Sequence, residues 1–313
     1  MDMKYSQLVV FLVICFTKVH GRTENGHCEP TELLPYTCEV HLVEDAQQPI
    51  TIVIFDENAS ANGLQIKGHL KSIPDISDAT KKLVKLNRLE IRGVGLKSVR
   101  AGQLAAFERI SELDVSDNQI SELDAESFKE LRDLEFIKLH NNEIEILPLG
   151  IFDSNQKLYY IQLNDNKLKE IHVDTFHQHP DLNFLYLRNN QIEVLSATVF
   201  RNNNKMHLIH LDHNRLKALH NDTFKGLKDL RFLELNENQI EILPKGLFDD
   251  NTKLGYVSLQ NNKLMKIETD LQKLRKLISL NLTGNVCISQ ECEFKGRDCL
   301  SALIEDVQQK CSN

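Results

Sequence analysis

Residues 134–144 read LEFIKLHNNEI, and residues 158–168, which begin 24 positions later, read LYYIQLNDNKL. Both stretches have Leu or Ile at their first, fourth, sixth and eleventh positions and Asn at their ninth. Copies of this pattern start at the following residues: Leu86, Ile110, Leu134, Leu158, Leu182, Met206, Leu230 and Leu254. A last copy starts at Leu277, 23 residues after the one before it. A fixed period of this length is the sequence signature of a protein built from stacked structural repeats.

This repeated segment resembles the leucine-rich repeat, and the resemblance extends over residues 86–285, with a degenerate copy around Leu64 and Ile66. It implies an α/β repeat solenoid, a horseshoe in which each repeat contributes one short strand to a parallel sheet on the concave face. Parallel strands cannot be joined by tight hairpins, so the rest of each repeat has to return along the convex side. We expect about ten copies within residues 61–285, with disulfide-bonded caps at both ends.

Two further rows recur with the same period. An Asn at the ninth position of each copy can satisfy backbone groups in the turn after the strand, which an apolar residue cannot do. This row consists of Asn118, Asn142, Asn166, Asn190, Asn214, Asn238, Asn262 and Asn285. A second row, predicted to fill the convex side of the core, consists of Phe128, Phe152, Phe176, Phe200, Phe224 and Phe248. In the first regular copy Val94 replaces the Asn and Leu104 replaces the Phe, as is typical of terminal repeats.

Residues 1–21 have the layout of a secretory signal peptide. Lys4 precedes an apolar run from Leu8 to Phe16, and Val19-His20-Gly21 offers a cleavage site. The run is too short to cross a bilayer, and no later apolar stretch approaches the roughly 18 residues that a membrane span needs. We therefore expect a secreted, extracellular protein without a membrane span.

Six cysteines follow residue 21, in two groups, and an extracellular compartment favours their pairing. Cys28 and Cys38 lie in residues 22–60, the predicted N-terminal cap. There Cys38, Val40 and Leu42, and then Ile50, Ile52 and Ile54, alternate with other residues and predict a disulfide-pinned hairpin.

The other four, Cys287, Cys292, Cys299 and Cys311, lie in the predicted C-terminal cap, residues 286–313. The spacing of Leu300, Leu303, Ile304 and Val307 predicts a short amphipathic helix within it. These four cysteines allow three pairings, and the sequence leaves all three open. Because an even number of cysteines can pair within the chain, no covalent dimer is expected.

Charge and motif content exclude several classes of function. The net charge of −8 disfavours nucleic acid or an anionic membrane as the main partner. The sequence contains no phosphate-binding glycine loop, no His-Glu-x-x-His and no Gly-x-Ser-x-Gly, so we predict no enzymatic activity and no cofactor. His207, His210 and His213 are spaced by three residues, which places them on alternating faces of a strand, so no metal site is predicted from them.

The outward strand positions are unusually apolar. The third position of six consecutive copies holds an aromatic residue or Leu, and these residues, the aromatic row, are Phe136, Tyr160, Phe184, Leu208, Phe232 and Tyr256. Two mixed polar rows follow it, the polar border: Lys138, Gln162, Tyr186, His210 and Glu234, then His140, Asn164, Arg188, Asp212 and Asn236. An exposed apolar stripe with a polar rim is typical of a protein-binding surface. We predict a ligand-binding surface made of Phe136, Tyr160, Phe184, Phe232 and Tyr256, bordered by Tyr186, Arg188 and His210. The alternative is that the rings only stack on one another.

The sequence thus predicts a secreted recognition protein that binds an extracellular protein or a surface glycan through its concave face. It resembles Toll-ectodomain-like proteins and insect leucine-rich immune proteins without their C-terminal coiled coil, which implies a role in innate immunity. The alternative is an extracellular-matrix or developmental adhesion or signalling protein. Glycosylation is expected at the sequons of Asn58, Asn221 and Asn281, the last of which falls on an outward strand position.

Two histidines are expected to face acidic residues across the sheet. The 24-residue register places His210 in line with Glu234, and His213 in line with Glu237. Protonation near the ordinary imidazole pKa of about 6.5 would then add attraction between these pairs.

Overall fold

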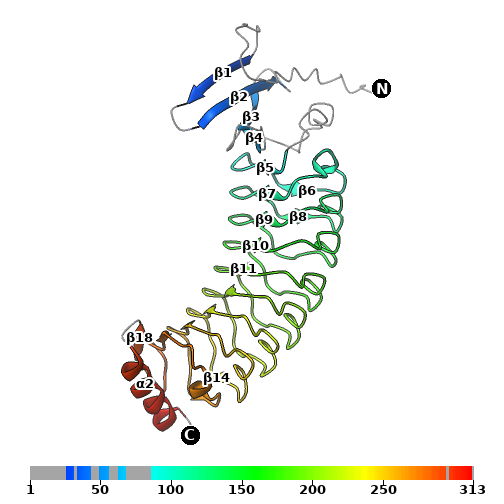
Figure 1. Ribbon diagram of the computed structural model, residues 1–313. Helices are drawn as coiled ribbons and strands as arrows, with labels where there is room; N and C mark the ends of the chain where they lie inside the picture. The colour runs from blue at the N-terminus through cyan, green and yellow to red at the C-terminus, as the bar shows by residue number, and fades with distance from the viewer. Residues whose placement is uncertain are drawn as a thin grey trace.

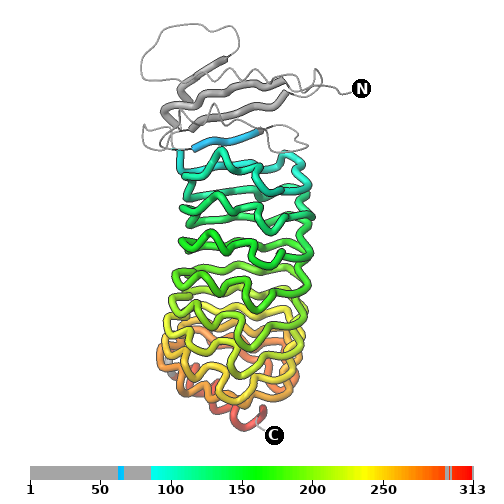
Figure 2. The backbone as a smooth tube through the Cα atoms, turned by 90° about the vertical axis from the view of Figure 1, so that its right-hand side faces the viewer, coloured from blue at the N-terminus to red at the C-terminus, as the bar shows by residue number. Residues whose placement is uncertain are grey.

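The computed structural model describes residues 26–31, 34–43, 49–55, 63–67, 86–293 and 296–311. From residue 86 onwards the chain forms a curved stack of similar turns, with short strands side by side along the inner side of the curve (Figure 1). The view from the side shows the successive turns stacked one on another (Figure 2). The predicted repeat solenoid with a parallel concave sheet is confirmed.

One sheet connects most of the described strands. In spatial order they are β1 (Gly26–Thr31), β2 (Leu34–Val43), β3 (Pro49–Phe55), β4 (Gly63–Lys67), β5 (Arg88–Glu90), β7 (Glu112–Asp114), β9 (Phe136–Lys138), β10 (Tyr160–Gln162), β11 (Phe184–Tyr186), β12 (Leu208–His210), β13 (Phe232–Glu234), β15 (Tyr256–Ser258), β17 (Ser279–Asn281) and β18 (Glu291–Glu293). Neighbours from β4 to β17 are parallel, and from β5 to β15 the paired residues are 24 positions apart. The middle residue of each repeat strand, such as Leu185 in β11, is fully buried.

The convex side holds short elements only. Two strand pairs occur there among the described residues, β6 (Ser98–Val99) with β8 (Glu122–Leu123) and β14 (Ile242–Leu243) with β16 (Lys266–Ile267). Two 3₁₀ helices, η1 (Ala105–Phe107) and η2 (Leu271–Lys273), lie near the two ends of the stack. The Phe row is buried as predicted, with stacked rings in adjacent repeats, for example Phe128 on Phe152 at 6.1 Å between ring centroids.

The Asn row forms the predicted buried ladder. The side-chain nitrogen of Asn190 donates to the carbonyl oxygens of Leu163 (2.9 Å) and Leu187 (3.0 Å), and its oxygen accepts from the N–H of Leu168 (3.1 Å). The same set of bonds recurs from Asn118 to Asn285. In each set two bonds reach the preceding repeat, and the third stays within the repeat of the Asn. The ladder therefore fixes both the turn after the strand and the register between repeats.

The residue before each ladder Asn adopts a left-handed conformation, with φ between 51° and 58° at Asp117, Asn141, Asp165, Asn189, His213, Glu237 and Asn261. Gly93 and Gly284 take this place in the first and last copies. Asn, Asp and Gly tolerate positive φ best, which explains why they fill most of these positions. His213 and Glu237 lie on this turn and not on a strand.

A second polar row, which the sequence analysis did not identify, lies buried on the convex side. Asn155, His179, Asn203 and Asn251 each follow a row Phe by three residues. Asn203 donates to the carbonyl oxygens of Phe176 and His179, and Nε2 of His179 lies 3.1 Å from the carbonyl oxygen of Phe152. His179 thus occupies a position that Asn fills in other repeats.

Burial lowers the pKa of His179 below its ordinary value. The hydrogen bonds of His179 to the backbone and the charge of Asp153 oppose this shift, and His177 adds to it. The imidazole of the unfolded chain, with a pKa of about 6.5, therefore binds a proton before the folded one does. Stability should fall as pH decreases below about 6.5. His179→Asn, which restores the Asn donor, should show a smaller decrease in melting temperature between about pH 7.5 and pH 5 than the wild type. Equal decreases in both proteins would contradict this assignment.

The N-terminal strands pair as the alternating pattern predicts: β2 is antiparallel to β3, and β4 joins the sheet beside β5. Cys28 lies opposite Cys38 in the β1–β2 register, and the disulfide between them stays a prediction. The predicted signal peptide at residues 1–21 and the sequon at Asn58 lie outside the described residues. The domain boundaries also stay predictions. No helix within the described ranges is long and apolar enough to cross a membrane.

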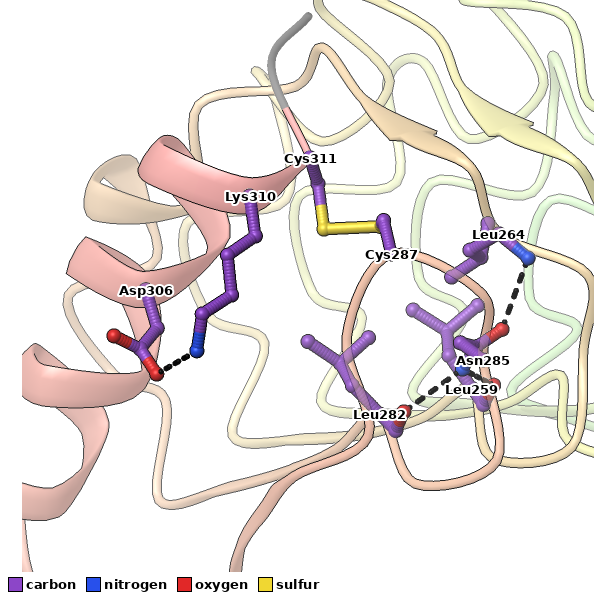
Figure 3. The surroundings of a disulfide bond; sticks show 8 residues. All are labelled: Leu259, Leu264, Leu282, Asn285, Cys287, Asp306, Lys310 and Cys311. Atoms are coloured by element: carbon purple, nitrogen blue, oxygen red, sulfur yellow. Dashed lines mark hydrogen bonds and ion pairs between the residues drawn. A yellow bond between two sulfur atoms is a disulfide. The ribbon is translucent and has the colours of Figure 1, made fainter.

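The C-terminal cap contains the predicted amphipathic helix, α2 (Arg297–Lys310), whose Leu300, Leu303 and Val307 are buried. Of the three possible pairings, the structure has Cys287 bonded to Cys311 and Cys292 bonded to Cys299. The first disulfide connects the end of α2 to the turn after the last ladder residue, Asn285 (Figure 3).

Candidate functional site

The aromatic row lies on the concave side, in the predicted register. Phe136, Tyr160, Phe184, Leu208, Phe232 and Tyr256 are paired in sequence along β9 to β15. Rings in neighbouring repeats contact one another, with centroids 6.0 Å apart for Phe136 and Tyr160 and 6.4 Å apart for Phe232 and Tyr256. Most of the row is half-buried by these contacts, but 48% of Phe232 is exposed. The rings therefore contact one another at tilted angles and also keep apolar surface available.

Tyr159 belongs to this surface, although the sequence analysis missed it. Its ring lies 5.3 Å from Phe184 and 5.9 Å from Phe136, in edge-on contacts. Tyr159 precedes β10, so its direction is not set by the alternation of side chains within a strand. A Tyr-Tyr dipeptide at the entry of the strand was the only signal available in the sequence.

Polar groups of the border fix the orientation of the aromatic row at its centre. The hydroxyl of Tyr160 donates to Gln162 at 2.9 Å, and burial, with a smaller effect of Tyr186, raises the pKa of Tyr160 to about 12. Tyr186 packs on Tyr160 on one side and on His210 on the other, at 5.1 Å and 4.9 Å between centroids. Both tyrosines remain neutral hydroxyl donors at physiological pH.

The N-terminal end of the concave face is occupied by charges that neutralise one another. Glu112 contacts Lys138 at 2.7 Å and Arg88 at 3.7 Å, and Arg92 contacts Asp117 at 2.8 Å. These groups are already engaged within the protein. The apolar stripe in the middle repeats is therefore better suited to a ligand than this charged end is.

At the other end of the border, His210, Asp212 and Glu234 converge in a group that we call the His-Asp-Glu cluster. Their nearest ligand atoms all lie within 4.8 Å of one another, and His210 Nδ1 is 3.7 Å from Glu234 Oε2. Burial, followed by the effect of Asp212, raises the pKa of Glu234 to about 7. The sequence analysis placed these residues in two adjacent rows but did not bring them together as a site.

Of the two expected histidine pairs, that of His210 with Glu234 is confirmed and that of His213 with Glu237 is wrong. Burial lowers the pKa of His210 below its ordinary value; Asp212 opposes this shift, and Arg188 adds to it. His213 does not pair with Glu237: its Nδ1 lies 3.0 Å from Asp212 Oδ2, while Glu237 accepts from Asn261. The left-handed turn directs His213 back toward the preceding residue. His207, whose Nδ1 contacts the carbonyl of Lys205, is not part of the cluster.

The sequon at Asn281 also differs from expectation. Only 5% of Asn281 is exposed, because β18 pairs with β17 on its far side. Its side-chain nitrogen donates to Gln260 at 2.6 Å, and its oxygen accepts from Thr283. Asn281 keeps its predicted place in the outward row, opposite Ser258, but its side chain is covered, and a glycan there would have to displace these contacts. Asn221, in contrast, is exposed.

Sequence comparison identifies the repeats directly. A family model described as "Leucine rich repeat" matches residues 84–144, 138–192, 156–216, 185–240 and 204–264. Together these matches span residues 84–264, which is more than half of the 313 residues. No curated protein matches the chain.

Solved structures with the same fold are found at low sequence identity. The crystal structure of TLR13 in complex with ssRNA13 is 24% identical, with a TM-score of 0.61, over 67% of this chain and 30% of that chain. A leucine-rich repeat protein from Leptospira interrogans is 22% identical, with a TM-score of 0.58, over 78% of this chain and 63% of that chain. The chain thus spans less than two thirds of either neighbour, and the likeness is one of fold.

Proposed function

The chain belongs to the leucine-rich repeat family, and from this we propose that it is an extracellular recognition protein that binds a protein or a surface glycan through its concave face. The observation that carries this proposal is the aromatic row, whose apolar surface is left open on the inner side of the curve. A row that served only the fold could be polar, because its side chains do not enter the core. Apolar surface with a polar rim favours a binding role.

Innate defence is the setting that we propose for this recognition. The resemblance to Toll-ectodomain-like proteins supports it, and the disulfides of the C-terminal cap are consistent with an oxidising, extracellular compartment. TLR13 has been crystallised with an RNA, but the net charge of −8 argues against nucleic acid as the ligand of this chain. No catalytic role is part of the proposal.

The test replaces Phe232 by Ser and measures what the chain captures. Phe232 is the row member of choice because it is the most exposed, whereas Phe184 supports Tyr159 and Tyr160. Immobilised wild type and variant are each used in pull-downs from extracellular fluid, and the captured proteins are compared by quantitative mass spectrometry. The variant should recover at least tenfold less of the partner than the wild type does. This corresponds to about 1.4 kcal/mol of binding free energy.

The matched control is Ile146→Ser, which removes an apolar side chain outside the aromatic row that is more exposed than Phe232, 64% against 48%. It should leave capture unchanged, and both variants should melt within a few degrees of the wild type. Equal recovery by wild type and Phe232→Ser would place the binding surface away from the aromatic row. If the captured partner were a matrix protein that is present in tissue without infection, the adhesion alternative would be favoured.

A further inference from the structure

The His-Asp-Glu cluster combines side chains from two adjacent repeats. His210 ends β12 and lies beside Glu234 of β13 in the parallel register, and Asp212 follows two residues after His210. One imidazole nitrogen and two carboxylate oxygens, all within 4.8 Å of one another, thus meet at one point of the sheet. Ligand atoms around a single ion bound at about 2.0–2.1 Å are about 3.3 Å apart, so the cluster would have to close by no more than about 1.5 Å.

Asp212 is the most buried member of the cluster. Only 1% of Asp212 is exposed, and its Oδ1 is buried and receives no N–H donor. The Asp212 carboxylate also shares a hydrogen bond with the carboxyl group of Glu234, which requires a proton between the two groups. Its other oxygen, Oδ2, already faces Arg188 Nε at 3.2 Å and His213 Nδ1 at 3.0 Å. Two carboxyl groups that meet at a buried position need a proton or a cation between them, so their contact beside the imidazole of His210 points to a cation site.

The donor set selects among cations. Ca²⁺ takes six to eight oxygen ligands and Mg²⁺ takes near-ideal octahedral oxygen geometry, and the cluster offers only two carboxylates and one imidazole. Zn²⁺ binds nitrogen and carboxylate oxygen together, commonly through three protein ligands with one position left open. Arg188 opposes a cation, but it contacts Oδ2 and about half of its side chain (52%) is exposed, so it has room to turn toward solvent.

We propose that His210, Asp212 and Glu234 bind one Zn²⁺ ion on the concave surface. His210 and Glu234 each keep about a quarter of their side chains exposed, 22% and 25%, so the ion has an open coordination position toward the concavity. The site lies beside Phe232, at the edge of the aromatic row, because Glu234 and Phe232 are the outward residues of the same strand.

The test titrates Zn²⁺ into the purified full chain, without an affinity tag or reducing agent, by isothermal titration calorimetry. The wild type should bind one ion, and His210→Gln and Glu234→Gln should each weaken binding at least tenfold. Matched controls in the same two repeats, His207→Gln and Glu237→Gln, should bind as the wild type does. Absence of Zn²⁺ binding by the wild type, or equal effects of the cluster and control variants, would overturn the proposal.

A second measurement does not depend on any variant. Zn²⁺ added to wild type with ¹⁵N-labelled histidine should shift the imidazole resonances of His210 and leave those of His207 in place. Co²⁺ in place of Zn²⁺ should give the visible absorption of a four-coordinate site, and excess Zn²⁺ should remove it. A shift at another histidine without one at His210 would show that the ion binds elsewhere and would refute the assignment.

Discussion

Replacement of Asn190 by Leu is expected to lower the free energy of unfolding by about 4 kcal/mol. Leu has a similar volume, so the loss does not come from a cavity. It comes first from the buried N–H of Leu168, which loses its side-chain partner. The carbonyl groups of Leu163 and Leu187 each lose one of two amide donors and keep Asn166 and Asn214, respectively. An unsatisfied buried backbone group costs about 1–3 kcal/mol, and each lost hydrogen bond about 0.5–1.5 kcal/mol. Denaturant unfolding monitored by circular dichroism measures the change.

The control for this substitution is Asn204→Leu, at an exposed position in the same repeat. It should change stability by no more than about 0.5 kcal/mol. Hydrogen exchange should further show that Asn190→Leu loosens the repeats on both sides of residue 190, because stability in a solenoid depends on the interfaces between neighbours. A loss of less than about 1 kcal/mol would mean that water or backbone movement replaces the Asn amide.

Removal of the Cys287–Cys311 disulfide by a double substitution to Ala should cost about 3 kcal/mol, from the loop-closure entropy of a loop of this length. The bridge closes a sequence separation of 24 residues and holds the end of α2, whose Cys311 carbonyl accepts from the N–H of Ile267 at 2.9 Å. Without it, α2 can leave the end of the stack and expose the last core residues. Non-reducing thermal melts and hydrogen exchange over residues 264–311 would report the change.

The paired control is the Cys292→Ala, Cys299→Ala double variant. That disulfide closes a separation of only 7 residues, so its loss should cost about 1 kcal/mol less in the same entropy model. In this variant, hydrogen exchange should become faster only in residues near β18 and the start of α2. If the two double variants were equally unstable, the cap would be held by its packing, through Leu300, Leu303 and Val307, and not by the longer bridge.

The repeat architecture could be predicted from the sequence because one residue type at one spacing recurs in every copy. Leu185 and its equivalents, Asn190 and its equivalents, and the Phe row have environments made by identical neighbours 24 residues away. The same argument located the aromatic row. What it could not provide was the amount of surface that each ring keeps, which depends on side chains such as Tyr159 that lie outside the alternating pattern.

The sites that depart from the repeat were the ones that sequence reasoning missed. His179 lies in the convex polar row only because of the return path of the chain, and Asn281 is buried only because β18 turns back antiparallel beside β17. The choice among three cysteine pairings also depended on where α2 packs. These outcomes depend on contacts at the end of the stack or between loops. The 24-residue repeat does not determine which residues are neighbours there.

The sequence by itself determined the period, the parallel register, the two rows that fill and satisfy the core, and the face on which the aromatic row lies. These properties are local to a repeat and are multiplied by its copies, so a pattern is enough to predict them. The register also placed His210 beside Glu234, but only the tertiary structure decided that Asp212 joins them and that His213 contacts Asp212. Their meeting depends on the left-handed turn after β12 and on the burial of Asp212, and both are set by side-chain packing between two particular repeats.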